Sequence, residues 1–143
     1  MPDSDPVRLK AKPDVRRLLL SCARKDKHIY YGELVKKVPK LRMKGPSPPL
    51  YRLLDIIDVE EAEVHEGPMI SAMAVHKKPH SPASERPRVE PGDGFYETAY
   101  TLYPNRLTAV TDRDLTVADR DRRYAFWEDE RKAVVAYARN QPR

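Results

Sequence analysis

Basic side chains gather around one predicted helix start, where they could bind phosphate groups. Lys40, Arg42 and Lys44 come before the Ser-Pro-Pro-Leu sequence of residues 47–50, and Arg52 follows it. Lys and Arg side chains neutralise the phosphates of nucleic acids and so supply most of the non-specific affinity for them. We expect the free backbone amides of the helix start to attract phosphate as well.

A second group of bases lies in residues 77–92. This segment contains prolines at positions 79, 82, 87 and 91, which predict a polar, basic loop. The loop also carries His80 among its bases. From the two groups together we predict these nucleic-acid-binding residues: Lys40, Arg42, Lys44, Ser47, Tyr51, Arg52, Lys77, Lys78, Arg86 and Arg88.

The charge of the chain is unevenly distributed along its length. Residues 1–52 hold 14 Lys and Arg against 5 Asp and Glu, whereas the remaining residues have a balance of −4 within a net charge of +5. Residues 55–66 hold six acidic side chains and no Lys or Arg. This asymmetry predicts a polyanion-facing surface in the first part of the chain. Two alternatives stay open. In the first, the bases only form a solvated surface; in the second, the chain is an adaptor subunit that docks a basic protein partner through residues 55–66.

Hydrophobic spacing predicts the elements that position the first group of bases. Residues 1–13 lack periodicity and are predicted to be a flexible basic arm. A first helix is expected from residue 13 or 14 to about residue 25, and a short second helix should end before Pro39. Cys22 lies on the apolar stripe of the first helix, which predicts a buried hydrophobic residue and not a nucleophile.

A third helix should begin at the basic cluster itself. Ser47 is a favourable N-cap residue, and Pro48 fits the first helical position. Hydrophobic residues continue at helical spacing from there to about Glu63. Because residues 69–76 form a short apolar run, they are predicted to be a buried strand.

The last part of the chain predicts two further elements. Residues 95–103 fit either a strand or a helix, and we favour the helix. Thr116 with Asp119 three residues later forms a capping pair, which predicts the start of a long terminal helix. No repeat or hinge divides the chain, so residues 14–143 should form a single domain.

This order of elements is that of a winged helix-turn-helix domain in the α+β class. We expect a mostly helical domain with a small sheet, an added C-terminal helix and the loop of residues 77–92 as the wing. In this architecture the third helix enters the major groove and the wing contacts the backbone or the minor groove. The acidic second half of the third helix would be repelled by a duplex, so the helix should dock by its N-terminal end.

A family resemblance extends over residues 31–95. The Tyr-Gly-Glu-Leu-Val sequence of residues 31–35, the Arg-Leu-Leu of residues 52–54 and the Gly-Pro of residues 67–68 resemble the DNA-binding domain of alkylguanine-DNA alkyltransferases and alkyltransferase-like proteins. Gly94 and Phe95 could stand for the glycine-aromatic turn of that family. The resemblance implies a winged-helix domain that binds double-stranded DNA.

The resemblance also implies roles for individual residues. The arginine that replaces a flipped base in that family would correspond to Arg52, and the phosphate-side tyrosine to Tyr30 or Tyr31, so Tyr31 joins the predicted binding residues. The active-site segment of the family is Pro-Cys-His-Arg, whereas here Pro68 is followed by Met-Ile-Ser. Alkyl transfer needs an activated thiolate. We therefore expect non-catalytic binding.

Other chemistries have weaker support in the sequence. His76 and His80 are four residues apart, but Pro79 prevents one helix from presenting both to a metal ion. Residues 13–14 and 130–132 loosely resemble a metal-dependent nuclease motif, yet both pieces fall on predicted helices instead of adjacent strands. A nuclease is therefore the less favoured alternative, and we expect neither a metal nor another cofactor.

The sequence also indicates the cellular compartment in which we expect the protein. No apolar run approaches the ~20 residues that cross a bilayer, and the first residues lack the apolar segment of a signal peptide. The single cysteine fits a reducing compartment. We expect a cytoplasmic protein without a membrane partner.

Overall fold

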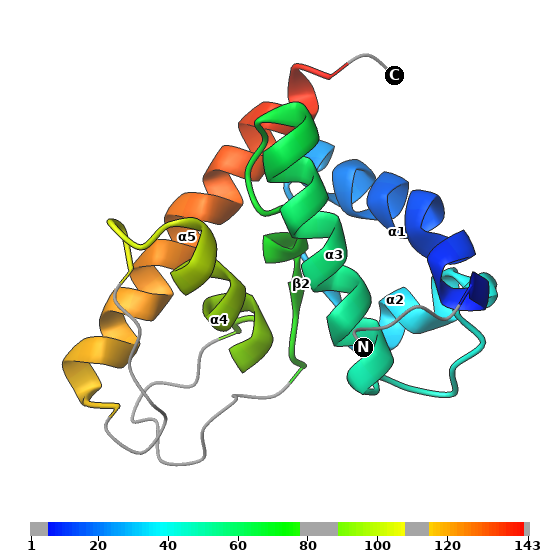
Figure 1. The fold of residues 1–143 in the computed structure, drawn as a ribbon, viewed down its shortest axis with the longest axis horizontal. Helices are drawn as coiled ribbons and strands as arrows, with labels where there is room; N and C mark the ends of the chain where they lie inside the picture. Colours follow the sequence, from blue (N-terminus) through cyan, green and yellow to red (C-terminus); the bar gives the residue numbers. More distant parts are fainter. Residues whose placement is uncertain (1–5, 78–88, 108–114, 142–143) are drawn as a thin grey trace.

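The computed structural model describes residues 6–77, 89–107 and 115–141, and it is mostly helical (Figure 1). The structure also contains two short 3-10 helices, η1 (Pro39–Leu41) and η2 (Ile70–Met73). The expected α+β class with a small sheet and a C-terminal helix is confirmed in this coarse form. The helices and strands, in chain order, are α1 (Pro6–Arg24), β1 (Ile29–Tyr30), α2 (Tyr31–Lys37), α3 (Pro48–His65), β2 (Ala74–Val75), α4 (Asp93–Leu102) and α5 (Val117–Arg139).

The sheet consists of two strands of two residues each. β1 and β2 are parallel, with Ile29 opposite Ala74 and Tyr30 opposite Val75. Parallel strands need a long crossover connection, and here α2, η1, α3 and η2 provide it. Because α2 follows β1 directly, the pairing holds the start of α2 beside the end of β2.

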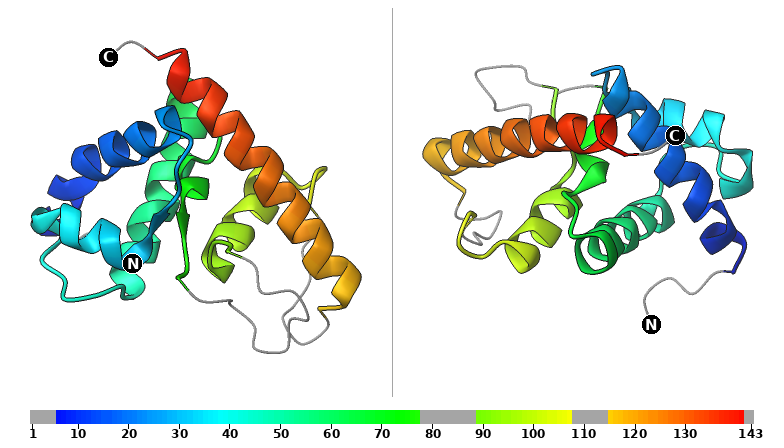
Figure 2. Two further views of the ribbon diagram at one scale, coloured as in Figure 1. Left: turned by 180° about the vertical axis from the view of Figure 1, so that it is seen from behind. Right: turned by 90° about the horizontal axis from the view of Figure 1, so that it is seen from above.

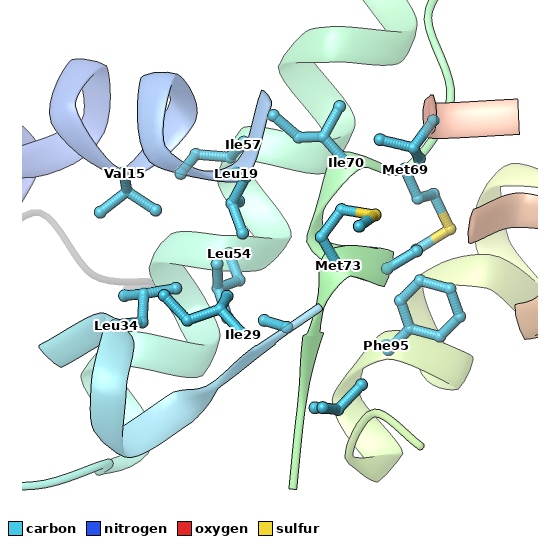
Figure 3. Close-up of a cluster of buried hydrophobic side chains, with 14 of the residues drawn as sticks. Val15, Leu19, Ile29, Leu34, Leu54, Ile57, Met69, Ile70, Met73 and Phe95 are labelled. Atoms are coloured by element: carbon cyan, nitrogen blue, oxygen red, sulfur yellow. The ribbon is translucent and has the colours of Figure 1, made fainter. Parts of the chain in front are cut away.

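The hydrophobic core lies between α1, α3, α5 and η2. Figure 3 shows Val15 and Leu19 of α1 facing Ile57 of α3, with Met69 and Met73 toward α4 and α5. All five of these side chains are at most 2% exposed. Figure 2 shows α5 running along the molecule from the end of α1 to the side of α4. A single core therefore joins the two ends of the chain.

Helix α1 begins earlier than the sequence predicts. The prediction of a flexible arm is wrong for residues 6–13, which form the first turns of α1; residues 1–5 lie outside the described residues. Ala11 and Val15 are fully buried, so one apolar stripe continues across the exposed Pro13. A proline inside a helix costs about 3 kcal/mol. Burial on both sides of Pro13 offsets that cost, and the helix does not break there.

The segment after α3 departs from the prediction in its backbone. Residues 69–76 are largely buried, as expected, but only Ala74–Val75 is a strand, and residues 70–73 form η2. Side chains take up the backbone groups that a strand would pair with a neighbour. Three hydrogen bonds do so: from Met69 N to Glu130 Oε2 (2.9 Å), from Ser71 N to Asp58 Oδ1 (3.0 Å) and from Trp127 Nε1 to Ala72 O (2.8 Å).

The remaining helices agree closely with the sequence. α2 ends before Pro39, and α4 resolves the ambiguity over residues 95–103 in favour of a helix. At the start of α5, the Asp119 N–H donates to Thr116 Oγ1 over 3.1 Å, as the capping pair predicts. Among the residues described, none of these helices has the length and apolar character needed to cross a membrane.

Candidate nucleic-acid interface

The candidate interface lies at the end of the molecule where α3 begins and β2 ends (Figure 1). The connector between α2 and α3 crosses this end. Arg42 ends η1 with φ 53° and ψ 48°, a left-handed conformation that residues other than glycine adopt infrequently, and so redirects the chain toward α3. Six exposed bases of this region are termed the basic surface: Lys36, Lys40, Arg42, Lys44, Arg52 and Lys77.

Most of the basic surface is not neutralised by the protein itself. Lys40 pairs with Asp14 of α1, with 3.4 Å between Nζ and Oδ2. The other five bases have no carboxylate partner among the described residues. Three bases of α1 differ in this respect, since Lys12, Arg16 and Arg17 all form ion pairs. Other exposed bases of the first 52 residues, among them Lys10, Lys25, Lys27 and Lys37, also have no carboxylate partner within the described residues.

A groove of about 500 Å³ opens beside these bases. Its lining includes Tyr30 and Tyr31 at the start of α2, His76 after β2 and Pro46 of the connector. Lys36 and Lys77 also line it. Sequence reasoning included Lys77 but missed Lys36 and His76 as members of one site. The pairing of β1 with β2 brings them together, and no local pattern predicts that pairing.

Tyr31 lies behind the basic surface and not on it. The side chain is buried, and its hydroxyl accepts a hydrogen bond from the Gly92 N–H over 3.0 Å. Its ring packs edge-on against Tyr51 and His76, with centroids 5.2 and 5.0 Å away. Burial raises the pKa of the Tyr31 hydroxyl above its ordinary value. A Cβ at Gly92 would lie 2.9 Å from Nε2 of His76, so a larger residue there would have to displace the His76 ring.

The start of α3 lacks the free amides expected to bind phosphate. Pro48 and Pro49 have no N–H, and the Leu50 N–H donates to the carbonyl of Ser47 over 2.9 Å. The Ser47 hydroxyl donates to Met43 Sδ over 3.5 Å instead of capping the helix. The expectation of an amide phosphate site is therefore wrong. Any phosphate binding at this helix start must come from the side chains.

The acidic segment 55–66 is largely engaged within the protein. Glu61 is buried, and its carboxylate accepts from Arg16 Nε (2.6 Å), Arg16 Nη2 (3.0 Å) and the Tyr137 hydroxyl (2.6 Å). Glu60 pairs with Lys12 on α1, over 2.6 Å. We term the contact of Glu61 with Arg16 and Tyr137 the clasp, because it joins α3 to α1 and α5.

Asp58 is also inaccessible to a partner. Its carboxyl group is fully buried and bonds to the N–H and hydroxyl of Ser71. Burial raises its pKa to about 8, although the Ser71 hydrogen bonds oppose the shift. Asp55 bonds to the Thr98 hydroxyl (2.9 Å), and burial raises its pKa to about 6. Of the six acids, Glu63 and Glu66 remain exposed without a partner among the described residues.

The residues that carry the family resemblance have mixed surroundings. Arg52 is exposed on the basic surface, whereas Met69 and Ile70, at the place of the family's catalytic segment, are fully buried. Gly94 and Phe95 belong to the first turn of α4, and Phe95 packs in the core. Three predicted binding residues, Lys78, Arg86 and Arg88, lie outside the described residues, as does His80.

The other residues that the sequence analysis considered for catalysis or metal binding lie in other parts of the fold. Cys22 is half-buried, and burial raises the pKa of its thiol. Glu130, part of the nuclease-like pattern, is buried and accepts from Met69 N and from Arg106 Nη1 (3.0 Å). Within the described ranges, no three His, Cys, Asp or Glu side chains come together in a metal-binding group.

Comparison of the chain with protein-family models, with curated proteins and with solved structures found no match.

Proposed function

We propose that this protein is a non-catalytic nucleic-acid-binding protein of the winged-helix type, and that it binds double-stranded DNA through the basic surface. One observation carries the proposal. Five exposed bases have no carboxylate partner among the described residues, and they belong to α2, the connector, α3 and the residues after β2, while the acids of α3 are largely engaged internally. A duplex supplies the missing negative charge.

The order of elements supports the winged-helix part of the proposal. A helix, a strand, two helices and a second strand follow one another from α1 to β2. After β2, the His76 N–H donates to the Glu90 carbonyl over 3.0 Å, so the chain returns beside the strand, as at the root of a wing. In this arrangement α3 is the recognition helix. Its second half is held by α1 and α5 through the clasp, so its first turns would enter the groove.

Salt dependence tests whether phosphate contacts drive the binding. We expect the affinity for a duplex to fall about a thousandfold between 50 and 200 mM salt if about six phosphates are neutralised. Fluorescence anisotropy with a labelled duplex measures this fall. Absence of binding at low salt, or affinity that does not change with salt, contradicts the proposal.

A pair of charge reversals tests whether the basic surface is the site. The double variant Lys44→Glu, Arg52→Glu should lose about 100-fold in affinity, since two attractive contacts become repulsive. The matched control is Lys25→Glu, Lys132→Glu, which reverses two exposed bases near the far end of α1 and on α5. Equal losses in both variants would place the duplex elsewhere.

The adaptor alternative predicts the opposite pattern. The double variant Glu63→Lys, Glu66→Lys changes the two acids of residues 55–66 that remain exposed. Under the DNA-binding proposal it leaves the affinity for a duplex within about threefold of the native value.

Incubation of plasmid DNA with Mg²⁺ or Mn²⁺ and the protein tests the nuclease alternative, and intact plasmid is the expected result.

A further inference from the structure

The groove beside the basic surface differs from a surface that binds only phosphate. Its lining includes Tyr30, Pro46, His76 and the largely buried Tyr31, whereas its positive charge comes from Lys36 and Lys77. A volume of about 500 Å³ falls in the range of sites that hold small organic ligands. Rings with positive charge beside them match a planar aromatic group that carries a phosphate.

The charge of the groove favours an anion. Glu33 is the acidic residue among its lining residues, and its Oε1 accepts a hydrogen bond from the Tyr30 N–H over 3.2 Å. That carboxylate thus has a role in the start of α2. Lys36 and Lys77 have no carboxylate partner among the described residues and outweigh it by one charge.

The groove is continuous with the basic surface. Lys36 and Lys77 belong to both, and Pro46 follows Lys44 by two residues in the connector. A strand whose phosphates follow the basic surface would therefore pass the groove. A paired base in a duplex keeps its faces stacked on its neighbours, so only an unpaired base can offer a face to the rings.

We propose that this groove holds one unpaired nucleotide next to a bound duplex, with its base against the rings of Tyr30 and His76 and its phosphate near Lys36 and Lys77. The inference rests on the proposed function and adds to it a preference for duplexes that have a single-stranded end. Because one base stacks on aromatic side chains, we expect about a tenfold preference for the extended duplex.

Gly32 offers a way to block the groove without disturbing the fold. It lines the groove in α2, and a Cβ built on it meets no heavy atom within 4 Å. Its φ is not positive, so a side chain there is not strained. The variant Gly32→Leu should therefore fold and fill the groove. Gly45→Leu is the matched control, since Gly45 also has open space around it and does not line the groove.

The experiment compares two labelled duplexes by fluorescence anisotropy, one blunt and one with the same paired region and a short single-stranded extension. The native protein and Gly45→Leu should prefer the extended duplex about tenfold. In Gly32→Leu and Tyr30→Ala the preference should fall below about twofold, with little change for the blunt duplex. Tyr30→Phe retains the ring and should keep the preference.

The outcomes separate this inference from the proposed function. Equal, salt-dependent affinity of the native protein for both duplexes overturns the inference and leaves the proposed function standing. A preference that survives in Gly32→Leu also overturns it. Absence of binding to both duplexes overturns the proposed function, and the inference with it.

Discussion

The first turns of α3 carry the base Arg52, whereas the rest of the helix carries acids, and the two parts use their charges in different ways. In the first half, Arg52 is exposed and has no carboxylate partner within the described residues. In the second half, Glu61 is buried and bonds to α1 and α5 through the clasp, and Asp58 is buried against Ser71. One half of the helix therefore offers charge to a partner, and the other uses charge to hold the fold together.

This difference shows why the charge of a segment does not by itself identify an interaction surface. Residues 55–66 contain six acids, a pattern that predicts a solvated face or a docking face for a basic partner. The fold instead brings bases of α1 to two of these acids, Glu60 and Glu61. The same contacts neutralise Lys12 and Arg16, so these two bases are not available to a polyanion.

The largest expected effect comes from breaking the clasp. Glu61→Ala should lower the free energy of unfolding by about 3 kcal/mol, because it leaves Arg16 and the Tyr137 hydroxyl without their shared acceptor. Urea unfolding followed by circular dichroism measures the change. The control Glu63→Ala removes an exposed acid of the same helix and should change stability by less than about 0.5 kcal/mol. Similar values for the two variants would mean that the clasp contributes no stability.

The buried carboxyl group of Asp58 should make stability depend on pH. Its pKa rises from 3.8 to about 8 on folding, so between these values the folded state holds a proton that the unfolded state has lost. The contribution of this group to stability therefore falls as pH rises through that window, by at most about 1.4 kcal/mol per pH unit.

Asp58→Asn tests this pH dependence directly. The amide oxygen can accept from the Ser71 N–H, and the amide NH2 can donate to the Ser71 hydroxyl. Because the amide does not titrate, the variant should lose less stability with rising pH than the native protein. Urea unfolding at pH 5, 6, 7 and 8 gives the two slopes. Asp129→Asn, at an exposed position of α5, should retain the native slope. Equal slopes for Asp58→Asn and the native protein would show that Asp58 is ionised in the fold.

A substitution of Tyr31 tests whether this tyrosine has a structural role or contacts nucleic acid. Tyr31→Phe should cost about 1–2 kcal/mol of stability, since the buried Gly92 N–H loses its acceptor. Tyr51→Phe, at the half-buried neighbour whose hydroxyl has no hydrogen bond among the described residues, should cost less than about 0.5 kcal/mol. Thermal unfolding monitored by circular dichroism compares the two. A stable Tyr31→Phe variant would remove the structural role assigned to this hydroxyl.

The smallest expected effect concerns single bases of the basic surface. Lys44→Ala should weaken duplex binding about fivefold and reduce the slope of log affinity against log salt by about one. Lys132→Ala on α5 is the matched control and should leave both quantities unchanged. Anisotropy titrations at four salt concentrations provide the slopes. An unchanged slope for Lys44→Ala would exclude Lys44 from the phosphate contacts.

Local signals in the sequence predicted much of the secondary structure. The capping pair of Thr116 and Asp119, the Ser-Pro start of α3 and the hydrophobic spacing of each helix act within a few residues, so they can be read without the fold. The same signals failed at Pro13 and in residues 69–73. There, buried contacts with distant residues override the local preference of the backbone.

The sequence by itself determined the mostly helical content and the excess of positive charge in the first 52 residues, because these depend on composition and short spacings. Only the tertiary structure decided which charges remain available. Glu61 meets Arg16 and Tyr137 across 45 and 76 residues of chain, and the groove requires β1 to lie beside β2. Such contacts arise from the packing of whole elements around one core, and no spacing within a single element encodes them.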